Sequence, residues 1–123
     1  MHIIEVFGRI FLSTIFLFEG INKIFNYEST IKYMESFNVP ELLAIPTIIL
    51  EILFPLLLII GYQTKLSALV LAIFTFTTAL IFHTDFTNQM QLISFLKNFA
   101  IAGGFLILFI NGAGKYSLDH KLS

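Results

Sequence analysis

The 123-residue chain is 57% hydrophobic and only 12% charged, whereas ordinary soluble domains are about half apolar and about a quarter charged. Its formal net charge of −1 excludes a broad basic surface for nucleic acid. Because the chain has no cysteine, it cannot itself form a disulfide, a thiol redox couple or a cysteine-bound iron–sulfur cluster. The composition therefore predicts an integral membrane protein.

Four apolar stretches are long enough to cross a bilayer as helices, which takes about 17 to 25 residues each. They cover residues 6–25, 42–60, 66–82 and 92–110. The stretches are continuous and do not alternate with polar residues, so they favour helices over a β-barrel. The first has no basic flank and no small-residue cleavage site, so we interpret it as a span and not as a secretory signal.

Short connections predict that neighbouring spans are antiparallel, which gives an all-α, up-down-up-down four-helix bundle in one domain over residues 1–123. The longest connection contains STIKYMESFNVP and predicts a short interfacial helix over residues 29–38, capped by Ser29 or Thr30. The sequence after residue 110, NGAGKYSLDHKLS, is expected to be a mobile tail.

Lysine and arginine near the ends of the spans predict the orientation. The side that holds both termini carries Arg9, Lys65, Lys115 and Lys121, and the opposite side carries Lys23 and Lys32. This excess predicts a multi-pass protein of the bacterial inner membrane with both termini in the cytoplasm. Arg9 itself is expected to be an interfacial anchor whose side chain reaches the headgroups.

Polar side chains interrupt the spans at comparable depths. On a helical wheel Glu19 and Lys23 share an arc of the first span, and Glu51 lies near the middle of the second. We predict a polar site in the outer half of the bundle, formed by Glu19, Asn22, Lys23, Glu51, His83, Lys97 and Asn98. An unpaired charge in the membrane costs about 2.5 to 3.5 kcal/mol, so the two glutamates should pair with Lys97 or Lys23.

Two interpretations of this polar site remain open. It is either a functional site, as is common for ionisable residues inside membranes, or a structural ion pair that fixes the register of the helices. His83, with an ordinary pKa of about 6.5, suits proton transfer, but a histidine at a helix end also often only caps the helix or meets water. The spacing of histidines and carboxylates predicts no metal site.

Several segments together resemble the DoxX family of small four-helix bacterial membrane proteins. They are RIFLSTIFLFEGINKIF, YMESFNVP, the stretch from PTIILEILF to ALIFH, and NQMQLISFLKNFAIAGGFLILFINGAGKYSLD. The similarity covers nearly the whole chain. The ordered set that carries it is Gly20 with Lys23, Glu51, Gly61-Tyr62, His83, Lys97-Asn98, Gly103-Gly104 and the tail GKYSLD. Glu19 departs from the small residue that is usual in the family.

Two functional hypotheses of different kinds follow, the first of them implied by the resemblance. Family members are described as oxidoreductases by kinship with the DoxD-type membrane subunit of archaeal thiosulfate:quinone oxidoreductase. This implies a quinone-linked subunit of a membrane redox complex, with a quinone as the candidate cofactor; His83 and Glu51 would then move protons, and Lys97 and Asn98 would bind a carbonyl. The alternative is a non-catalytic binding, carrier or assembly protein in the bilayer, working as a homo-oligomer or with a partner protein.

Overall fold

The computed structural model describes the backbone of residues 2–122 and the side chains of residues 3–122. Every regular element in this range is helical, so the prediction of an all-α fold is confirmed. The elements are α1 (His2–Phe25), α2 (Tyr27–Ser36), the 3-10 helix η1 (Glu41–Leu43), α3 (Ala44–Ile60), α4 (Thr64–Phe82), α5 (Gln89–Asn111) and α6 (Leu118–Leu122). A long helix covers each of the four apolar stretches, and α2, η1 and α6 are additional short helices.

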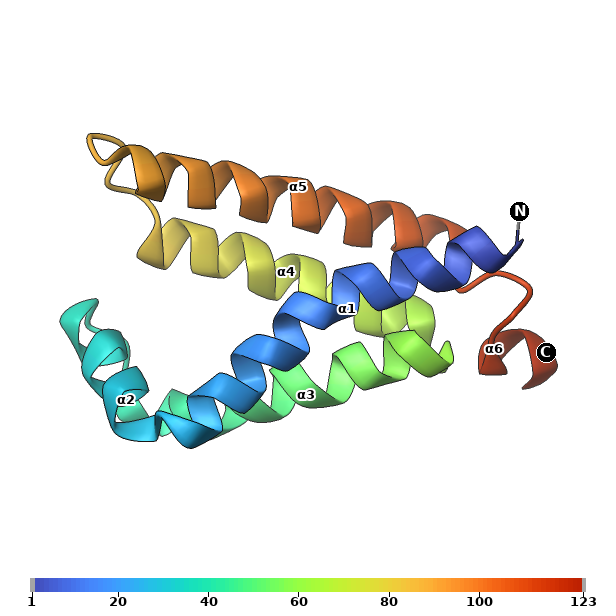
Figure 1. Cartoon of the computed structure of the whole chain (residues 1–123), viewed down its shortest axis with the longest axis horizontal. Coiled ribbons are helices and arrows are strands. Elements are labelled where there is room, and N and C mark those ends of the chain that lie inside the picture. The colour runs from blue at the N-terminus through green and yellow to red at the C-terminus, as the bar shows by residue number, and fades with distance from the viewer. Residues whose placement is uncertain (1, 123) are drawn as a thin grey trace.

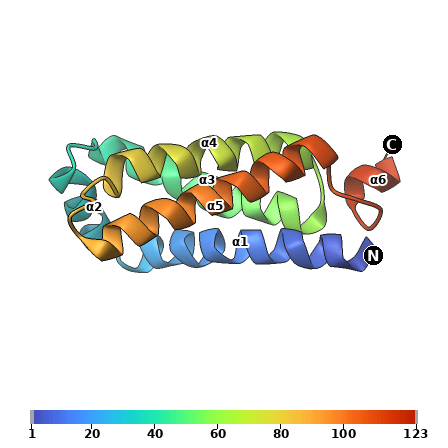
Figure 2. The same cartoon turned by 90° about the horizontal axis from the view of Figure 1, so that it is seen from above.

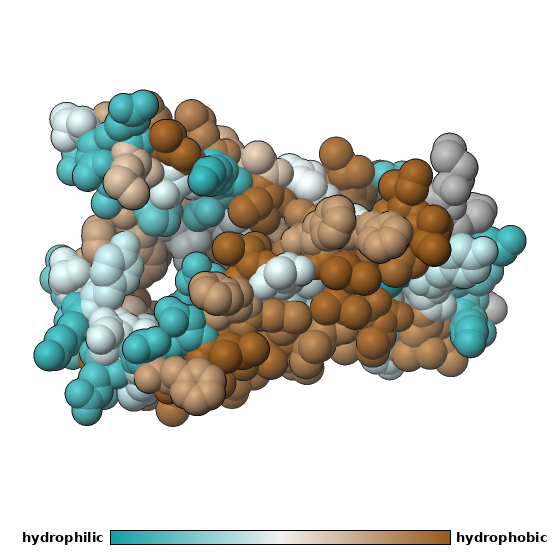
Figure 3. All heavy atoms as spheres, in the orientation of Figure 1, coloured by the Kyte–Doolittle hydropathy of each residue, from teal (hydrophilic) through white to brown (hydrophobic). Residues whose placement is uncertain are grey.

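Three helical segments of the described range are long and apolar enough to cross a membrane. They are Glu41–Ile60, Thr64–Phe82 and Gln89–Asn111. Helix α1 has sufficient length but carries more charged side chains, among them Arg9, Glu19 and Lys23. Hydrophobic side chains cover the middle of the molecule and hydrophilic side chains gather at both ends (Figure 3). This distribution matches a bilayer environment with polar interfaces on either side.

The long helices form two antiparallel pairs. Helix α1 packs along α3, helix α4 packs along α5, and a smaller contact between α3 and α4 joins the pairs (Figures 1 and 2). The pairs lie close together at the end that carries α6 and separate toward α2 (Figure 1). The packed core consists of Phe16, Leu58, Ala68, Leu71, Ala72 and Phe105.

Two glycines let the helices approach closely. A Cβ atom on Gly20 would lie only 2.8 Å from Cγ1 of Ile52, so the backbone of α1 packs closely against the Ile52 side chain of α3. A Cβ atom on Gly104 would lie 3.2 Å from Cδ2 of Leu12, which marks the contact between α5 and α1. Small residues at such positions are typical of helix packing in membranes, where close approach supplies dispersion energy.

Helix α2 is held by aromatic packing. The rings of Tyr33 and Phe37 lie 5.3 Å and 5.0 Å from the ring of Phe82 at the end of α4. The helix begins at Tyr27, earlier than predicted, and Thr30 donates its hydroxyl to the backbone carbonyl of Asn26. The prediction that Ser29 or Thr30 caps this helix is therefore wrong, because both residues already lie inside it.

The prediction of a mobile C-terminal tail is also wrong for residues 111–122, and residue 123 lies outside the described residues. Asp119 accepts hydrogen bonds of 2.8 Å from the amides of both Gln63 and Thr64, at the start of α4. Burial alone would raise the pKa of Asp119, but these amide donors and the nearby charge of Arg9 outweigh it and lower the pKa below its ordinary value. The acidic side chain thus complements the positive end of the α4 dipole and fixes α6.

Arg9 is not an interfacial anchor. Its residue is only 2% exposed, and its guanidinium donates to the backbone carbonyls of Leu58 (2.9 Å), Ile59 (3.1 Å) and Tyr116. The first two carbonyls belong to the last turn of α3, where most carbonyl groups have no N–H donor from within the helix. Arg9 therefore ties α1 to the end of α3 and to the segment before α6. The planar donor fork of arginine suits this role better than snorkelling to the surface.

Candidate ligand cavity between the helix pairs

A cavity of about 530 Å³ lies where the two helix pairs separate. All of α1 to α5 contribute to its walls, and its surface is mainly apolar. Figure 3 shows the molecule hollowed at this end, between α5 and the α1–α2 region. Pockets for small organic ligands typically measure about 300 to 1,000 Å³ and combine apolar walls with a few convergent polar groups. The cavity has both the size and the composition of such a site.

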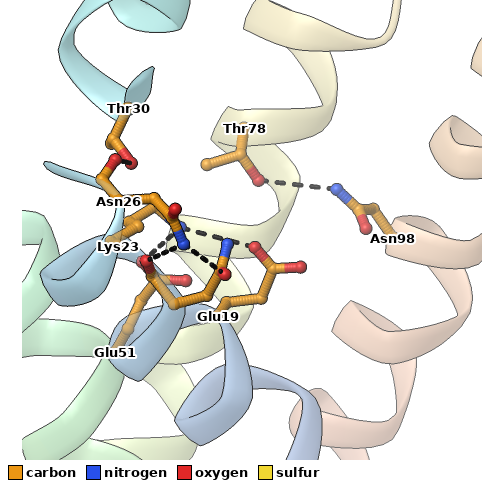
Figure 4. Close-up of polar contacts among 8 residues, drawn as sticks. Glu19, Lys23, Asn26, Thr30, Glu51, Thr78 and Asn98 are labelled. Carbon is orange, nitrogen blue, oxygen red and sulfur yellow. Dashed lines mark hydrogen bonds and ion pairs between the residues drawn. The ribbon is translucent and has the colours of Figure 1, made fainter. Parts of the chain in front are cut away.

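An ion pair between α1 and α3 lies on the cavity wall (Figure 4). Lys23 Nζ is 2.8 Å from Glu51 Oε1, and the Glu51 side chain is only 4% exposed. The close approach at Gly20 sets this geometry, because a Cβ atom there would lie 3.3 Å from the Glu51 Cβ and Lys23 follows one turn later on α1. A buried carboxylate needs such a partner, since an isolated charge would be strongly unfavourable in an apolar interior.

Glu19 adds a second carboxylate to the same ammonium. Its Oε2 lies 3.5 Å from Lys23 Nζ, one turn away on α1, and its side chain is 48% exposed. The group of Glu19, Lys23 and Glu51 therefore has two acids for one base. Pro55, one turn after Glu51 in α3, has no N–H group and so cannot donate to the backbone carbonyl of Glu51. The site is consequently rich in acceptors around a single ammonium donor.

The opposite wall is contributed by α4 and α5. Asn98 Nδ2 lies 3.5 Å from the Thr78 hydroxyl oxygen, a long contact that leaves the amide able to donate elsewhere. Thr75 and Thr78 donate their hydroxyls to backbone carbonyls of their own helix. Lys23 and Asn98 thus face the same cavity from opposite walls as hydrogen-bond donors.

The structure brings five of the seven predicted site residues around one cavity: Glu19, Lys23, Glu51, His83 and Asn98. It does not bring the other two there. Asn22 is exposed and its side-chain oxygen accepts from Asn26, while Lys97 is exposed on α5. Each is the immediate neighbour of a lining residue, and one residue along a helix turns a side chain by about 100°. Lys23, and not Lys97, is therefore the base that pairs with Glu51.

The cavity also has aromatic residues that are not among the predicted site residues. Tyr33 of α2 and Phe82 of α4 both line the cavity, and their rings stack on each other. The spacing of Tyr33 and Phe37, four residues apart on an amphipathic helix, was the available signal for an inward aromatic face. No group of three or more histidine, aspartate or glutamate side chains in the described part of the chain is arranged to hold a metal ion.

Comparison with known proteins gave a family and two curated relatives. The DoxX family model matches residues 4–84. The chain is 39% identical over 116 residues to Inner membrane protein YqjF of Escherichia coli K12, which covers 94% of this chain and 89% of that protein. It is 33% identical over 126 residues to Inner membrane protein YphA of the same organism, covering 97% and 90%. No solved structure matches the chain.

Proposed function

The chain belongs to the DoxX family of membrane proteins, and from this premise we propose that it is a quinone-binding subunit of a redox system in the bacterial inner membrane. One observation carries the proposal: the buried Lys23–Glu51 ion pair lies on the wall of a mainly apolar, ligand-sized cavity. A pair that only fastened two helices together would not need an adjoining cavity. Both relatives are named as inner membrane proteins, which supports the location.

In this proposal α1 is a fourth span, and the chain forms a single four-span domain. The 24 residues of α1 are enough to cross a bilayer. Its charges do not oppose insertion strongly, because Arg9 is bonded to backbone carbonyls and Lys23 is paired with Glu51. Both termini lie in the cytoplasm by the distribution of basic residues. A C-terminal green fluorescent protein fusion should fluoresce, whereas a dark fusion at normal expression would overturn this orientation.

The residues of the cavity fit a quinone. Lys23 and Asn98 are donors on opposite walls, suited to the two carbonyl oxygens of a quinone ring, while Phe16 and Ile101 provide apolar wall for the ring and chain. A bound quinone would supply a two-electron, two-proton acceptor. In the protein, Glu51 accepts from the Lys23 ammonium and so holds it beside the cavity, and His83 lines the same cavity with an imidazole, a group that can both donate and accept a proton. Electrons come from a reduced substrate or a partner protein.

Mass spectrometry of the protein purified in mild detergent tests this function. Wild type is expected to retain a quinone, and both Glu51→Gln and Lys23→Met are expected to lose it. Glu35→Gln is the matched control, because Glu35 is exposed on α2 and does not line the cavity. Circular dichroism of each variant separates loss of ligand from loss of fold. Retention of quinone by Glu51→Gln would refute the assignment of the site.

The alternative function is a non-catalytic carrier or assembly protein. The mainly apolar cavity surface also suits a lipid or another apolar solute, and binding alone requires no electron donor. The same purification decides between the two. A stoichiometric lipid or partner protein without any quinone would favour the alternative, and a homo-oligomer would be visible in the intact mass of the complex.

A further inference from the structure

Helices α1 and α5 touch in only one half of their length. At the α6 end, Leu12 packs against Gly104, and the rings of Phe16 and Phe105 lie 5.5 Å apart. Toward α2 the two helices diverge (Figure 1), and there Ile15 and Glu19 of α1 and Asn98 and Ile101 of α5 line the cavity instead of closing on each other. The cavity therefore extends between α1 and α5.

Glu19 and Lys97 lie one heptad beyond the contact between Leu12 and Gly104. The helices are antiparallel, so seven residues forward from Leu12 and seven residues back from Gly104 both lead toward α2, by about 10 Å. Two helical turns return a side chain to nearly the same face. Glu19 and Lys97 therefore occupy the faces that α1 and α5 turn toward each other, at the same level.

Neither charge is fully neutralised in this arrangement. Glu19 shares Lys23 at 3.5 Å with Glu51, which holds the same ammonium at 2.8 Å. The exposed ammonium of Lys97 has no ion pair or hydrogen bond with the described residues. Lys97 is eight residues into α5, about 12 Å along the helix and thus within the span. An opposite charge on a facing helix is the partner that such a position requires.

We propose that α1 and α5 form a lateral entrance from the bilayer to the cavity, and that Glu19 and Lys97 close it by pairing. This inference rests on the proposed binding function and specifies its ligand class. A molecule that enters between two spans at this depth must be dissolved in the hydrocarbon of the membrane. The ligand is therefore a lipid-soluble compound, and not a polar solute that arrives from water.

Disulfide cross-linking in native membranes tests closure, because the chain has no cysteine of its own. The full-length Glu19→Cys/Lys97→Cys variant should cross-link under mild oxidation, since a disulfide forms only when the Cβ atoms come within about 4.5 Å. Leu12→Cys/Gly104→Cys is the positive control, as these residues already touch. A yield for the first pair no higher than that of the outward-facing Phe18→Cys/Leu96→Cys pair would overturn the proposal.

The role of charge is tested with a separate reporter pair, Ile15→Cys/Ile101→Cys, whose positions lie between the contact and the entrance. Adding Lys97→Gln should lower the cross-linking rate about threefold, as expected for loss of one interhelical polar interaction in a membrane. Adding Lys97→Arg, which keeps the charge, should leave the rate near its original value. An equal rate for Lys97→Gln and Lys97→Arg would show that Glu19 and Lys97 do not pair.

A quinone-uptake assay distinguishes an error in the proposed entrance from an error in the proposed quinone-binding function. Decylubiquinone is added to membranes before or after oxidation of the Glu19→Cys/Lys97→Cys variant, and bound quinone is measured after purification. Oxidation should block uptake and a reductant should restore it, while oxidation of Leu12→Cys/Gly104→Cys should have no effect. Undiminished uptake by the cross-linked variant would refute the lateral route. No uptake by the reduced variant or wild type would instead refute quinone binding, and the cross-linking yields would still decide closure.

Discussion

Replacing Arg9 by methionine should destabilise the end of the molecule that carries α6. Methionine keeps much of the apolar stem but removes the guanidinium that donates to the carbonyls of Leu58, Ile59 and Tyr116. The carbonyl of Leu58 still accepts from the Gly61 amide, and Asp119 keeps its two amide donors, so the main loss falls on the other two carbonyls. Both of these hydrogen bonds are part-buried. At about 1.5 kcal/mol for each lost hydrogen bond to a charged group, the free energy of unfolding should fall by about 3 kcal/mol.

Two measurements check this prediction for Arg9→Met. The midpoint of thermal unfolding in detergent should fall, and trypsin should cleave faster after the exposed Lys115, because the segment that follows is no longer held. Lys65→Met is the control, since it removes a positive charge from an exposed side chain at the same end. If Arg9→Met left both the midpoint and the cleavage rate unchanged, the hydrogen bonds of the guanidinium would not hold this end together.

Three further predictions concern other contacts. The pKa of Asp119 is lowered in the folded chain, so its stabilising effect should be complete at neutral pH and be lost as the pH falls below about 4, through the folded pKa. The rate of proteolysis of the tail should rise over the same pH range, and Asp119→Asn should abolish this pH dependence. Gly20→Ala should destabilise the chain by about 1 to 3 kcal/mol through overpacking, whereas Gly8→Ala, with open space around it, should not lower the unfolding midpoint. Phe37→Ala should lower the free energy of unfolding by about 0.5 to 1.5 kcal/mol for each ring contact that is lost, and it should speed hydrogen exchange in α2. Replacing the exposed Phe25 by alanine should leave that exchange unaltered.

The helices and the depth of the polar residues were predictable from sequence because both depend on position along the chain. Apolar run length located the four long helices, and helical rise placed Glu51, His83 and Asn98 at levels from which they reach one cavity. Rotation about each helix axis was not predictable to the same degree. Lys97 differs from Asn98 by a single residue, yet it is exposed and does not line the cavity, since the sequence does not say which helix face meets a neighbour.

Contacts between distant segments were the least predictable. Arg9 resembled an interfacial anchor because its partners are backbone carbonyls at the end of α3. The residue types at those positions do not show that their carbonyls accept from an arginine. The tail looked polar and unstructured for a similar reason, as Asp119 binds backbone amides at the start of α4. Backbone groups are the same for nearly all residues, so pattern alone does not reveal them as partners.

The Arg9 contact also bears on the order of folding. Its bond to Tyr116 joins positions 107 residues apart, whereas each helix forms through contacts of three or four residues. The α4–α5 pair forms across residues 83–88, and the α1–α3 pair forms across residues 26–43. Contacts of such high sequence separation form slowly, because a long loop must close before they contribute any stability. The helix pairs should therefore assemble first, and docking of α6 should be a late step that converts a loosely joined set of helices into the native state.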